Sequence, residues 1–180
     1  LLSEALANSI EPELVKKIIR EWSVQPPSSH REAWPWRLKA YTLGRFRLCL
    51  DDEEMLLRGR VQYKVLELAR LLIAYGPEPI ASQQVIDALW PDAEGDSAAT
   101  NLKSTVHRLR TLFGDAGFLL VSDGKLSLNR SLCWVDSWAF DALAPASHAG
   151  TALELSTAEE ALALYRGDLF AQDHQPYLLP

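Results

Sequence analysis

The chain has 180 residues, of which 48% are hydrophobic and 23% charged, and its formal net charge is −6 at pH 7. This length suits one ordinary domain or a small domain with appendages, and the hydrophobic content is sufficient for a core. No apolar run approaches the roughly 18 residues of a membrane-spanning helix, so we expect a cytoplasmic protein without a membrane contact. The chain opens on Leu1 rather than on methionine and stops soon after "DLFAQDHQPY", so we expect a fragment of a larger protein.

Patterns for catalysis and metal binding are missing from this sequence. It contains no GxxxxGK[ST], HExxH or GxSxG motif, which would bind phosphates, bind zinc or present a nucleophilic serine. The four histidines share no ligand-like spacing, and Cys49 and Cys133 each lie in an apolar, strand-like run without a second ligand nearby. We therefore expect no enzyme activity, no metal, no cofactor and two reduced core thiols.

The acidic charge is concentrated towards the C-terminal end. Residues 131–180 contain seven acids and one base and account for the whole net charge, so residues 1–130 are neutral overall. Net charge bears on partners rather than on fold, and a locally basic surface in the neutral part could still meet a polyanion.

Residues 1–33 are expected to form a helical segment and a linker rich in proline and serine. Apolar residues recur at helical spacing between residues 3 and 22, with Pro12 suited to a first helical position. "SVQPPSSHREAWPW" then interrupts the pattern. Two runs typical of β-strands follow, "LKAYTLG" (38–44) and "RFRLCL" (45–50), after which the acids of 51–54 predict a turn and "MLLR" (55–58) a third strand.

Three helices are predicted next. The first, "VQYKVLELARLLIAYG" (61–76), is apolar on most sides, so we expect it to be largely buried with a narrow outer face of Tyr63, Glu67, Arg70 and Ala74. The second, "QQVIDALW" (83–90), would be capped by Ser82. After a loop, "PDAEGD" (91–96), the third would occupy 97–113 with Asp96 or Ser97 as its cap.

A β-hairpin and two further helices complete the pattern. Asp123-Gly124 separates two β runs in "FLLVSDGKLSLN" (118–129), and this dipeptide is a strong hairpin signal. "LCWVDSWAFDALA" (132–144) predicts a short strand leading into a helix capped by Asp136. The last helix is expected to begin at Thr157, with Glu160 completing a capping box, and to end at Gly167.

The helix at 97–113 is basic within an acidic chain. At about 100° per residue, Leu102, Val106, Leu109 and Phe113 form one apolar stripe. The other side mixes short polar residues with cations: Thr100, Asn101, Lys103, Ser104, His107, Arg108, Arg110 and Thr111. Solvated helices usually carry acid–base pairs four residues apart, but no acid occurs between residues 101 and 114. Such a surface suits a DNA major groove, where arginine pairs with guanine and flanking cations meet phosphates; a merely solvated surface is the alternative.

The order of these elements is that of a winged helix-turn-helix: a helix, a short helix, a basic helix and a hairpin. We therefore predict an α+β fold with an N-terminal antiparallel sheet, three helices and a C-terminal β-hairpin wing, flanked by helical segments. Lys125 at the hairpin tip would lie on the wing near the adjacent minor groove, beside the unfavourable Asp123.

Several stretches resemble a known family, the OmpR/PhoB-type winged helix, and in particular its streptomyces antibiotic regulatory protein type. They are "LGRFRL", "KVLELARLLIAYG", "VIDALWPDAEGDSAATNLKSTVHRLRTLFG", "LSLN" and "CWVDSWAFDAL". "ALALYRGDLF" is similar to the opening helix of the bacterial transcriptional activator domain that follows in those proteins. The resemblance implies a winged-helix domain at 34–136, an incomplete activator domain at 137–180, a four-stranded N-terminal sheet and a place in phosphorelay signal transduction.

The resemblance also implies a function and roles for residues. It makes the chain a sequence-specific DNA-binding domain of a bacterial transcriptional activator, with 97–113 as the recognition helix on double-stranded DNA. Ser104 and Arg108 become candidates for base edges, and the candidates for phosphates or flanking contacts are Thr100, Asn101, Lys103, His107 and Arg110. The loop 91–96, with Asp92 and Glu94, would touch RNA polymerase. Many relatives carry more arginine in this helix, where Thr105 and His107 stand here.

The alternative is a winged helix used for protein contact, either in a homodimer or in docking on a sensor domain. The acidic C-terminal segment favours it, because that segment could mask the basic helix. The last helix also has an apolar face that a missing bundle would leave uncovered, formed by Ala161, Leu162, Leu164, Tyr165 and Leu169. We expect this face to fold back on the winged helix or to meet a second chain.

Overall fold

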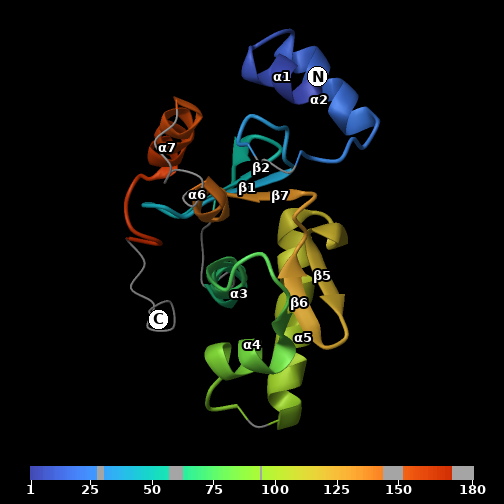
Figure 1. Ribbon diagram of the computed structural model, residues 1–180. Helices are drawn as coiled ribbons and strands as arrows, with labels where there is room; N and C mark the ends of the chain where they lie inside the picture. Colours follow the sequence, from blue (N-terminus) through green and yellow to red (C-terminus); the bar gives the residue numbers. More distant parts are fainter. Residues whose placement is uncertain (28–30, 57–62, 94, 144–151, 172–180) are drawn as a thin grey trace. The chain divides into compact units, whose positions relative to one another are not determined.

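The computed structural model describes residues 1–27, 31–56, 63–93, 95–143 and 152–171, which divide into two compact units (Figure 1). Unit 1 takes its residues from Leu1–Glu54 and Cys133–Asp173, and unit 2 from Met55–Leu132. The range 34–136 expected for the winged helix is thus shared between the units. Its first strands belong to unit 1, and its three helices and hairpin belong to unit 2.

The sheet of unit 1 has the strand order β3-β2-β1-β7. β1 (Leu38–Tyr41) pairs antiparallel with β2 (Arg47–Leu50), as the two β runs predicted, and β2 pairs with the short β3 (Glu53–Glu54). β7 (Cys133–Val135) joins the other edge in parallel, with Leu38 opposite Cys133. The fourth strand therefore comes from beyond the hairpin rather than from the N-terminal part of the chain.

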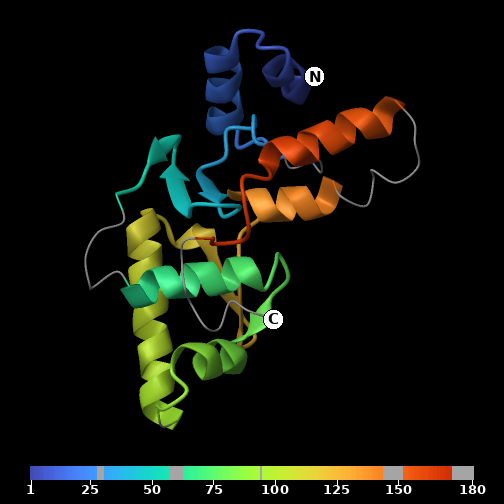
Figure 2. The ribbon, with the colours of Figure 1, turned by 90° about the vertical axis from the view of Figure 1, so that its left-hand side faces the viewer.

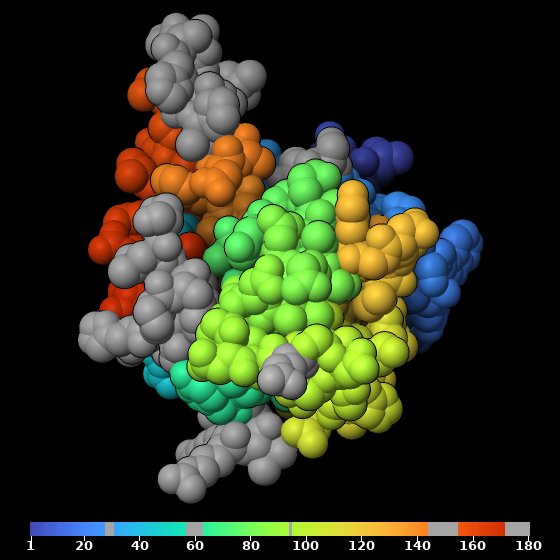
Figure 3. Space-filling view, turned by 90° about the horizontal axis from the view of Figure 1, so that it is seen from below, coloured from blue at the N-terminus to red at the C-terminus, as the bar shows by residue number. Residues whose placement is uncertain are grey.

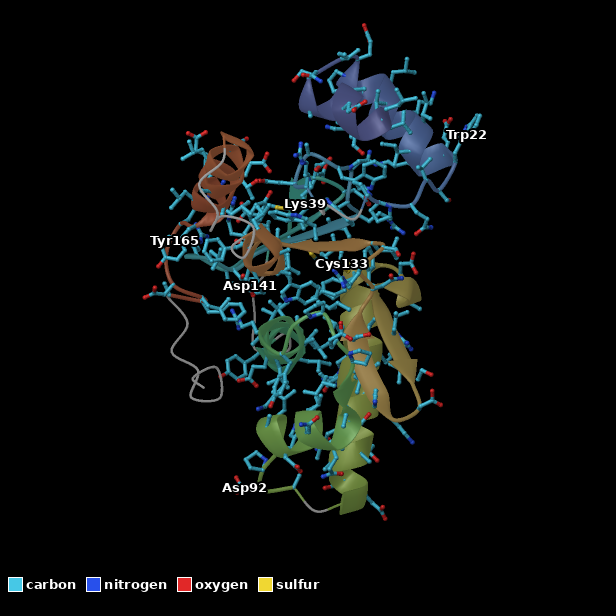
Figure 4. All side chains as sticks on the ribbon, in the orientation of Figure 1. Trp22, Lys39, Asp92, Cys133, Asp141 and Tyr165 are labelled. Atoms are coloured by element: carbon cyan, nitrogen blue, oxygen red, sulfur yellow. The ribbon has the colours of Figure 1, made fainter. Side chains whose placement is uncertain are left out.

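Four helices complete unit 1: α1 (Leu2–Ala7), α2 (Pro12–Glu21), α6 (Asp136–Leu143) and α7 (Ala152–Leu164). Pro12 occupies the first helical position of α2, as its missing N–H favours. A core of three tryptophans and small or branched apolar residues holds the N-terminal helices and α6 together; it comprises Leu6, Val15, Ile19, Trp34, Trp36, Trp134 and Ala139. Trp22 at the end of α2 is different, since 78% of it is exposed (Figure 4).

Unit 2 contains the helix-turn-helix elements and the hairpin. α3 (Tyr63–Ala74) packs on α4 (Ser82–Leu89) and runs across α5 (Gly95–Phe113), as Figure 2 shows. A short 3-10 turn (Ala116–Phe118) leads from α5 to β5 (Leu119–Ser122) and β6 (Lys125–Leu128), which form the predicted hairpin. β4 (Ile80–Ala81) adds to the free edge of β6, giving the order β4-β6-β5.

The third strand of unit 1 lies earlier than predicted. Asp51 and Asp52 both adopt left-handed conformations, with φ of 50° and 71°, so the chain reverses within two residues. Glu53 then pairs at once with Leu50. Met55 and Leu56 lie outside any strand, and residues 57 and 58 of "MLLR" lie outside the described ranges.

The outer face predicted for α3 is wrong at two positions. Tyr63 and Ala74 are exposed, but Glu67 is only 2% exposed and Arg70 only 8%. The Glu67 carboxylate lies 2.8 Å from the Lys64 ammonium, three residues earlier, and this ion pair offsets part of the cost of burying its charge.

Three helices begin earlier than their predicted caps. Ala81, not Ser82, precedes α4, because the Ala81 N–H already donates to the Gln84 side chain and the Ser82 N–H donates to the Gly124 carbonyl of the hairpin. α5 begins at Gly95, ahead of both Asp96 and Ser97. α7 spans Ala152–Leu164. It begins before Thr157 because most residues from 152 onward are good helix formers and none of them breaks a helix. Glu160 pairs with Arg31 at 3.4 Å instead of completing a capping box.

Candidate nucleic-acid interface

The apolar stripe of α5 fixes which side of this helix is free. The predicted residues Leu102, Val106, Leu109 and Phe113 are all buried, and the stripe also includes Ala98 and Thr105. Thr105 tolerates burial because its hydroxyl donates to the Asn101 carbonyl at 2.8 Å. The side opposite the stripe is therefore held outward by core packing.

Seven of the eight candidate residues on α5 are exposed: Thr100, Asn101, Lys103, Ser104, His107, Arg108 and Thr111. The hydroxyls of Thr100 and Thr111 donate to the carbonyls one turn earlier, Asp96 and His107, at 2.9 and 3.0 Å. These hydroxyls lie flat against the helix and keep their lone pairs as acceptors. The side chains between the cations are therefore polar and project little from the helix.

The cations of this surface have no acidic neighbour to neutralise them. Across the described ranges of the chain, the side chains of Lys103, His107 and Arg108 make neither a hydrogen bond nor an ion pair. The sole acid of α5 is Asp96 in the first turn, where its negative charge interacts favourably with the helix dipole. Residues 55–132 contain nine Lys and Arg against eight Asp and Glu, so this part of the acidic chain carries a slight positive charge.

Arg110 occupies a different position from the other cations. Its side chain is half-buried, and its Nη2 donates to the Leu119 carbonyl at 2.9 Å. Its Nε is buried and has no hydrogen-bond partner in the described part of the chain. Arg110 thus joins the end of α5 to the start of the hairpin, together with the edge-to-face contact of Phe113 and Phe118, whose ring centroids are 5.6 Å apart.

The hairpin forms the predicted two-residue turn next to α4 and α5. Asp123 and Gly124 have φ of 51° and 69°, the left-handed pair that matches the twist of the flanking strands. Lys125 follows the turn opposite Ser122 and is exposed. Figure 3 shows α4 (green), α5 (lime) and the hairpin (gold) on one surface of unit 2. Arg130, an exposed cation shortly after β6, was not among the candidates, although its place after a predicted β run could have indicated it.

The loop between α4 and α5 is shorter than predicted. Because α5 begins at Gly95, only residues 90–94 separate the two helices. Asp92 is exposed and points away from both helices (Figure 4), whereas Glu94 lies outside the described ranges. Lys64 of α3 donates to the Leu89 carbonyl at 3.0 Å and so anchors the chain where α4 ends.

The described ranges contain neither a metal-binding cluster nor a membrane-spanning helix. No group of three or more His, Cys, Asp or Glu side chains there is placed to hold a metal ion. No helix in those ranges is long and apolar enough to cross a membrane.

Comparison with known proteins gives a structural likeness. A scan against protein-family models and a search of curated proteins found no match. Among solved structures, the chain is similar to Mycobacterium tuberculosis EmbR in complex with a low-affinity phosphopeptide, with a TM-score of 0.55 and 25% sequence identity. The match covers 76% of this chain but only 38% of the EmbR chain. This likeness supports a winged-helix regulator fold.

Proposed function

We propose that this chain is the sequence-specific DNA-binding part of a bacterial transcriptional regulator. The observation that carries the proposal is the outward face of α5, where Lys103, His107 and Arg108 stand among short polar residues without an acidic partner in the described ranges. The similarity to EmbR, a transcriptional regulator, supports the same role. A helix with this surface, packed beside a short hairpin, suits insertion into a major groove.

Within this proposal, some residues of α5 contact base edges and others contact the DNA backbone. Arg108 and Ser104 lie one turn apart at the centre of the exposed face and read base edges. Lys103 and His107 meet the phosphates with Thr100, Asn101 and Thr111, and Lys125 meets the backbone from the hairpin tip. Arg110 supports this surface from behind, because its guanidinium is already bonded to Leu119.

The test uses two substitutions with different expected signatures. DNA fragments bound by the protein are first selected from the source genome, and affinity is then measured between about 50 and 200 mM salt. Arg108→Ala should keep the fold, cost about 1–3 kcal/mol at the selected site and relax the preference at one base pair. Lys103→Ala should weaken binding to all sequences alike and reduce the salt slope by about one unit.

The matched control is Lys17→Ala, which removes an exposed cation from α2 in unit 1. It should leave the DNA affinity of the chain unchanged. If Arg108→Ala changes no DNA affinity at any salt concentration but abolishes a protein complex, the helix is a docking surface and the DNA proposal fails.

Activation through RNA polymerase is the finer part of the proposal. Asp92 is exposed on a five-residue loop whose acids would repel phosphate, so it suits a protein partner better than DNA. Asp92→Ala should lower transcription from a reporter while leaving DNA affinity intact. An equal loss of transcription and DNA affinity would contradict a contact with polymerase.

A homodimer would place α7 against a second chain. Part of its apolar face is already covered within unit 1, since Ala161 is only 6% exposed, but Leu155 and Leu162 are 67% and 69% exposed. Sedimentation velocity over a range of concentrations should show a dimer that Leu162→Gln weakens. A monomer at every concentration would remove this part of the proposal.

A further inference from the structure

Unit 1 contains an open cavity of about 570 Å³ at the point where the chain returns to the sheet after α7. It lies between residues 41–47, which connect β1 to β2, and residues 166–171. Arg45, Arg47 and Arg166 line it together with the ring of Tyr41 and the backbone of Gly44. The volume is within the range of about 300–1,000 Å³ that small-molecule sites occupy.

Backbone contacts build this cavity. Gly44 donates to the Asp168 carbonyl at 2.9 Å, and Phe170 donates to the Thr42 carbonyl at 2.8 Å. Gly44 has φ of 97°, and a Cβ there would lie only 3.0 Å from the carbonyl oxygen of Arg166. The two chain segments therefore cross at a glycine, and this close crossing holds Arg166 beside the arginines of the β1–β2 connection.

The positive charges of the cavity are poorly balanced. The guanidinium carbons of Arg47 and Arg166 lie 4.5 and 5.8 Å from the centroid of the Tyr41 ring. Arg47 has one acidic neighbour, Glu54, at 3.7 Å. Arg45 and Arg166 have no acidic partner among the residues that the structure describes.

Tyr41 itself adds no negative charge. Its hydroxyl donates to the Glu32 carboxylate at 2.7 Å. Burial, followed by this hydrogen bond and the charge of Glu32, raises the pKa of Tyr41 well above its usual value. The phenol is therefore neutral at pH 7, and it presents a ring face to two guanidinium groups.

This cluster of three arginines lies in a unit whose net charge is negative. The ranges 1–54 and 133–173 together contain sixteen acids but only nine Lys and Arg, of which three line this cavity. Like charges brought together repel unless an anion is bound between them. Guanidinium forks match the oxygens of a phosphate in bidentate fashion.

We propose that this cavity binds the phosphoryl group of a small phosphate monoester through Arg45, Arg47 and Arg166. A phosphate dianion balances the cations better than a single carboxylate does, and the volume leaves room for an organic group next to it. Because residues 166–171 form one wall, the bound ligand would hold the segment after α7 on the sheet.

Calorimetry with the whole chain tests this site, using inorganic phosphate and phenyl phosphate as probes and benzoate as a singly charged comparison. Phenyl phosphate should bind saturably and more tightly than benzoate. Arg45→Gln and Arg166→Gln should each weaken it about ten-fold, the loss expected for a charged hydrogen bond, and Arg45→Lys by less. Arg130→Gln, which removes an exposed arginine from unit 2, should leave the affinity unchanged.

Hydrogen exchange supplies a second measurement that needs no substitution. Phenyl phosphate should slow exchange at the Gly44, Phe170 and Ala171 amides, which join the two walls of the cavity. The proposal is overturned if no saturable binding occurs, if both glutamine variants bind as well as the original chain, or if Arg130→Gln loses as much. Arg45 is exposed, so Arg45→Gln retains the fold even if Arg166→Gln disturbs it.

Discussion

Asp136 connects the first turn of α6 to the end of β1. Its carboxylate is 2% exposed, and it accepts hydrogen bonds from the Thr42 N–H at 2.8 Å, the Thr42 hydroxyl at 2.6 Å and the Leu43 N–H at 3.0 Å. The Ser137 N–H adds a fourth donor at 2.8 Å. Four donors converge on one buried charge, so this carboxylate is fully used within the fold and is not a candidate for chemistry.

Asp136→Asn should therefore destabilise unit 1 strongly. The new amide group turns two hydrogens towards N–H and O–H donors, and at least one buried donor then loses its acceptor. We expect the free energy of unfolding in urea to fall by about 2–4 kcal/mol. Asp141→Asn, on the exposed side of the same helix, is the control and should change it by less than about 0.5 kcal/mol. Equal effects at the two positions would show that the hydrogen bonds of Asp136 contribute nothing beyond a general loss of helix charge.

Individual residues show where helical periodicity correctly predicts exposure and where it does not. The helical period of α5 identified its buried stripe and seven exposed candidates, because that pattern depends on one helix alone. The same reasoning was wrong for Glu67 and Arg70 of α3, which are buried. Arg110, which was expected at the flank of the exposed face, is half-buried and bonded to the Leu119 carbonyl. Charge predicts exposure only when no partner is near, and the residues that surround a side chain in the fold cannot be read from helical spacing.

At the scale of elements, Arg110 couples α5 to the hairpin. Arg110→Ala removes the donor to the Leu119 carbonyl, so we expect unit 2 to lose about 1–2 kcal/mol in its free energy of unfolding. Lys103→Ala, an exposed cation on the same helix, should lose less than about 0.5 kcal/mol. Hydrogen exchange should also quicken at the amides of β5 in the Arg110 variant. If Arg110→Ala instead leaves stability unchanged and lowers the DNA salt slope by about one unit, the residue contacts phosphate as the sequence predicted.

Asp52 joins α2 to the sheet in a similar way. Its carboxylate lies 2.7 Å from the Lys39 ammonium and 3.2 Å from the Arg20 guanidinium. Burial alone would raise the pKa of Asp52, but the hydrogen bond to Lys39 and the charges of Lys39, Lys16 and Arg20 outweigh it and hold the pKa below its usual value. The unfolded chain therefore takes up this proton first as the pH falls.

The stability that Asp52 contributes should be present above the unfolded pKa of about 3.9 and should disappear as the pH falls through the lower folded pKa. Asp52→Asn should lower the urea midpoint of unit 1 at pH 7, and the difference from the original chain should vanish in acid. Asparagine tolerates the left-handed backbone at this position, so the turn is retained. Glu53→Gln, an exposed acid in the next position, is the control. A difference that stays constant from pH 7 to acid would mean that the ion pairs do not carry the effect.

The ends of elements were the least predictable part of each pattern. Ser82, Thr157 and the Asp96/Ser97 pair are good caps by type, yet each lies inside a helix or at its first residue. Caps compete with other uses of the same backbone groups, as the Ser82 N–H bonded to Gly124 illustrates. The Asp123-Gly124 turn was predicted correctly because its conformation depends on those two residues alone.

For the whole molecule, the order of helices and hairpin was predictable, but the pairing between distant segments was not. No local signal indicates that Cys133–Val135 pairs in parallel with β1, or that Leu43 bridges to Leu169 after α7. Within unit 1, α7 packs on α6, and the rings of Phe140 and Tyr165 lie 6.0 Å apart. Ala161 of the expected apolar face is buried, but Leu162, Tyr165 and Leu169 remain exposed, so the partner of this face stays a prediction. Long-range pairing depends on which surfaces remain uncovered once the local elements have formed, and a single sequence does not contain that information in any one segment.

The two units of the molecule differ in net charge. The residues of unit 1 carry sixteen acids against nine bases, whereas residues 55–132 carry a slight positive charge. If α5 binds DNA, unit 1 repels that DNA over distances set by salt. The Debye length is about 30 Å at 0.01 M salt and about 8 Å at 0.15 M.

Three of the exposed acids of unit 1 make neither hydrogen bonds nor ion pairs through their side chains in the described ranges, and they can be replaced together: Glu53, Asp141 and Glu159. Replacing all three with their amides should leave the thermal midpoint unchanged. Association with DNA of any sequence should become a few-fold faster at about 0.01 M salt, because the field opposing the polyanion is weaker. At about 0.3 M salt the original and the altered chain should associate at the same rate, since screening removes the field in both. A difference that persists at high salt would mean that these residues meet the DNA directly, and no difference at low salt would mean that the acids of unit 1 do not oppose binding.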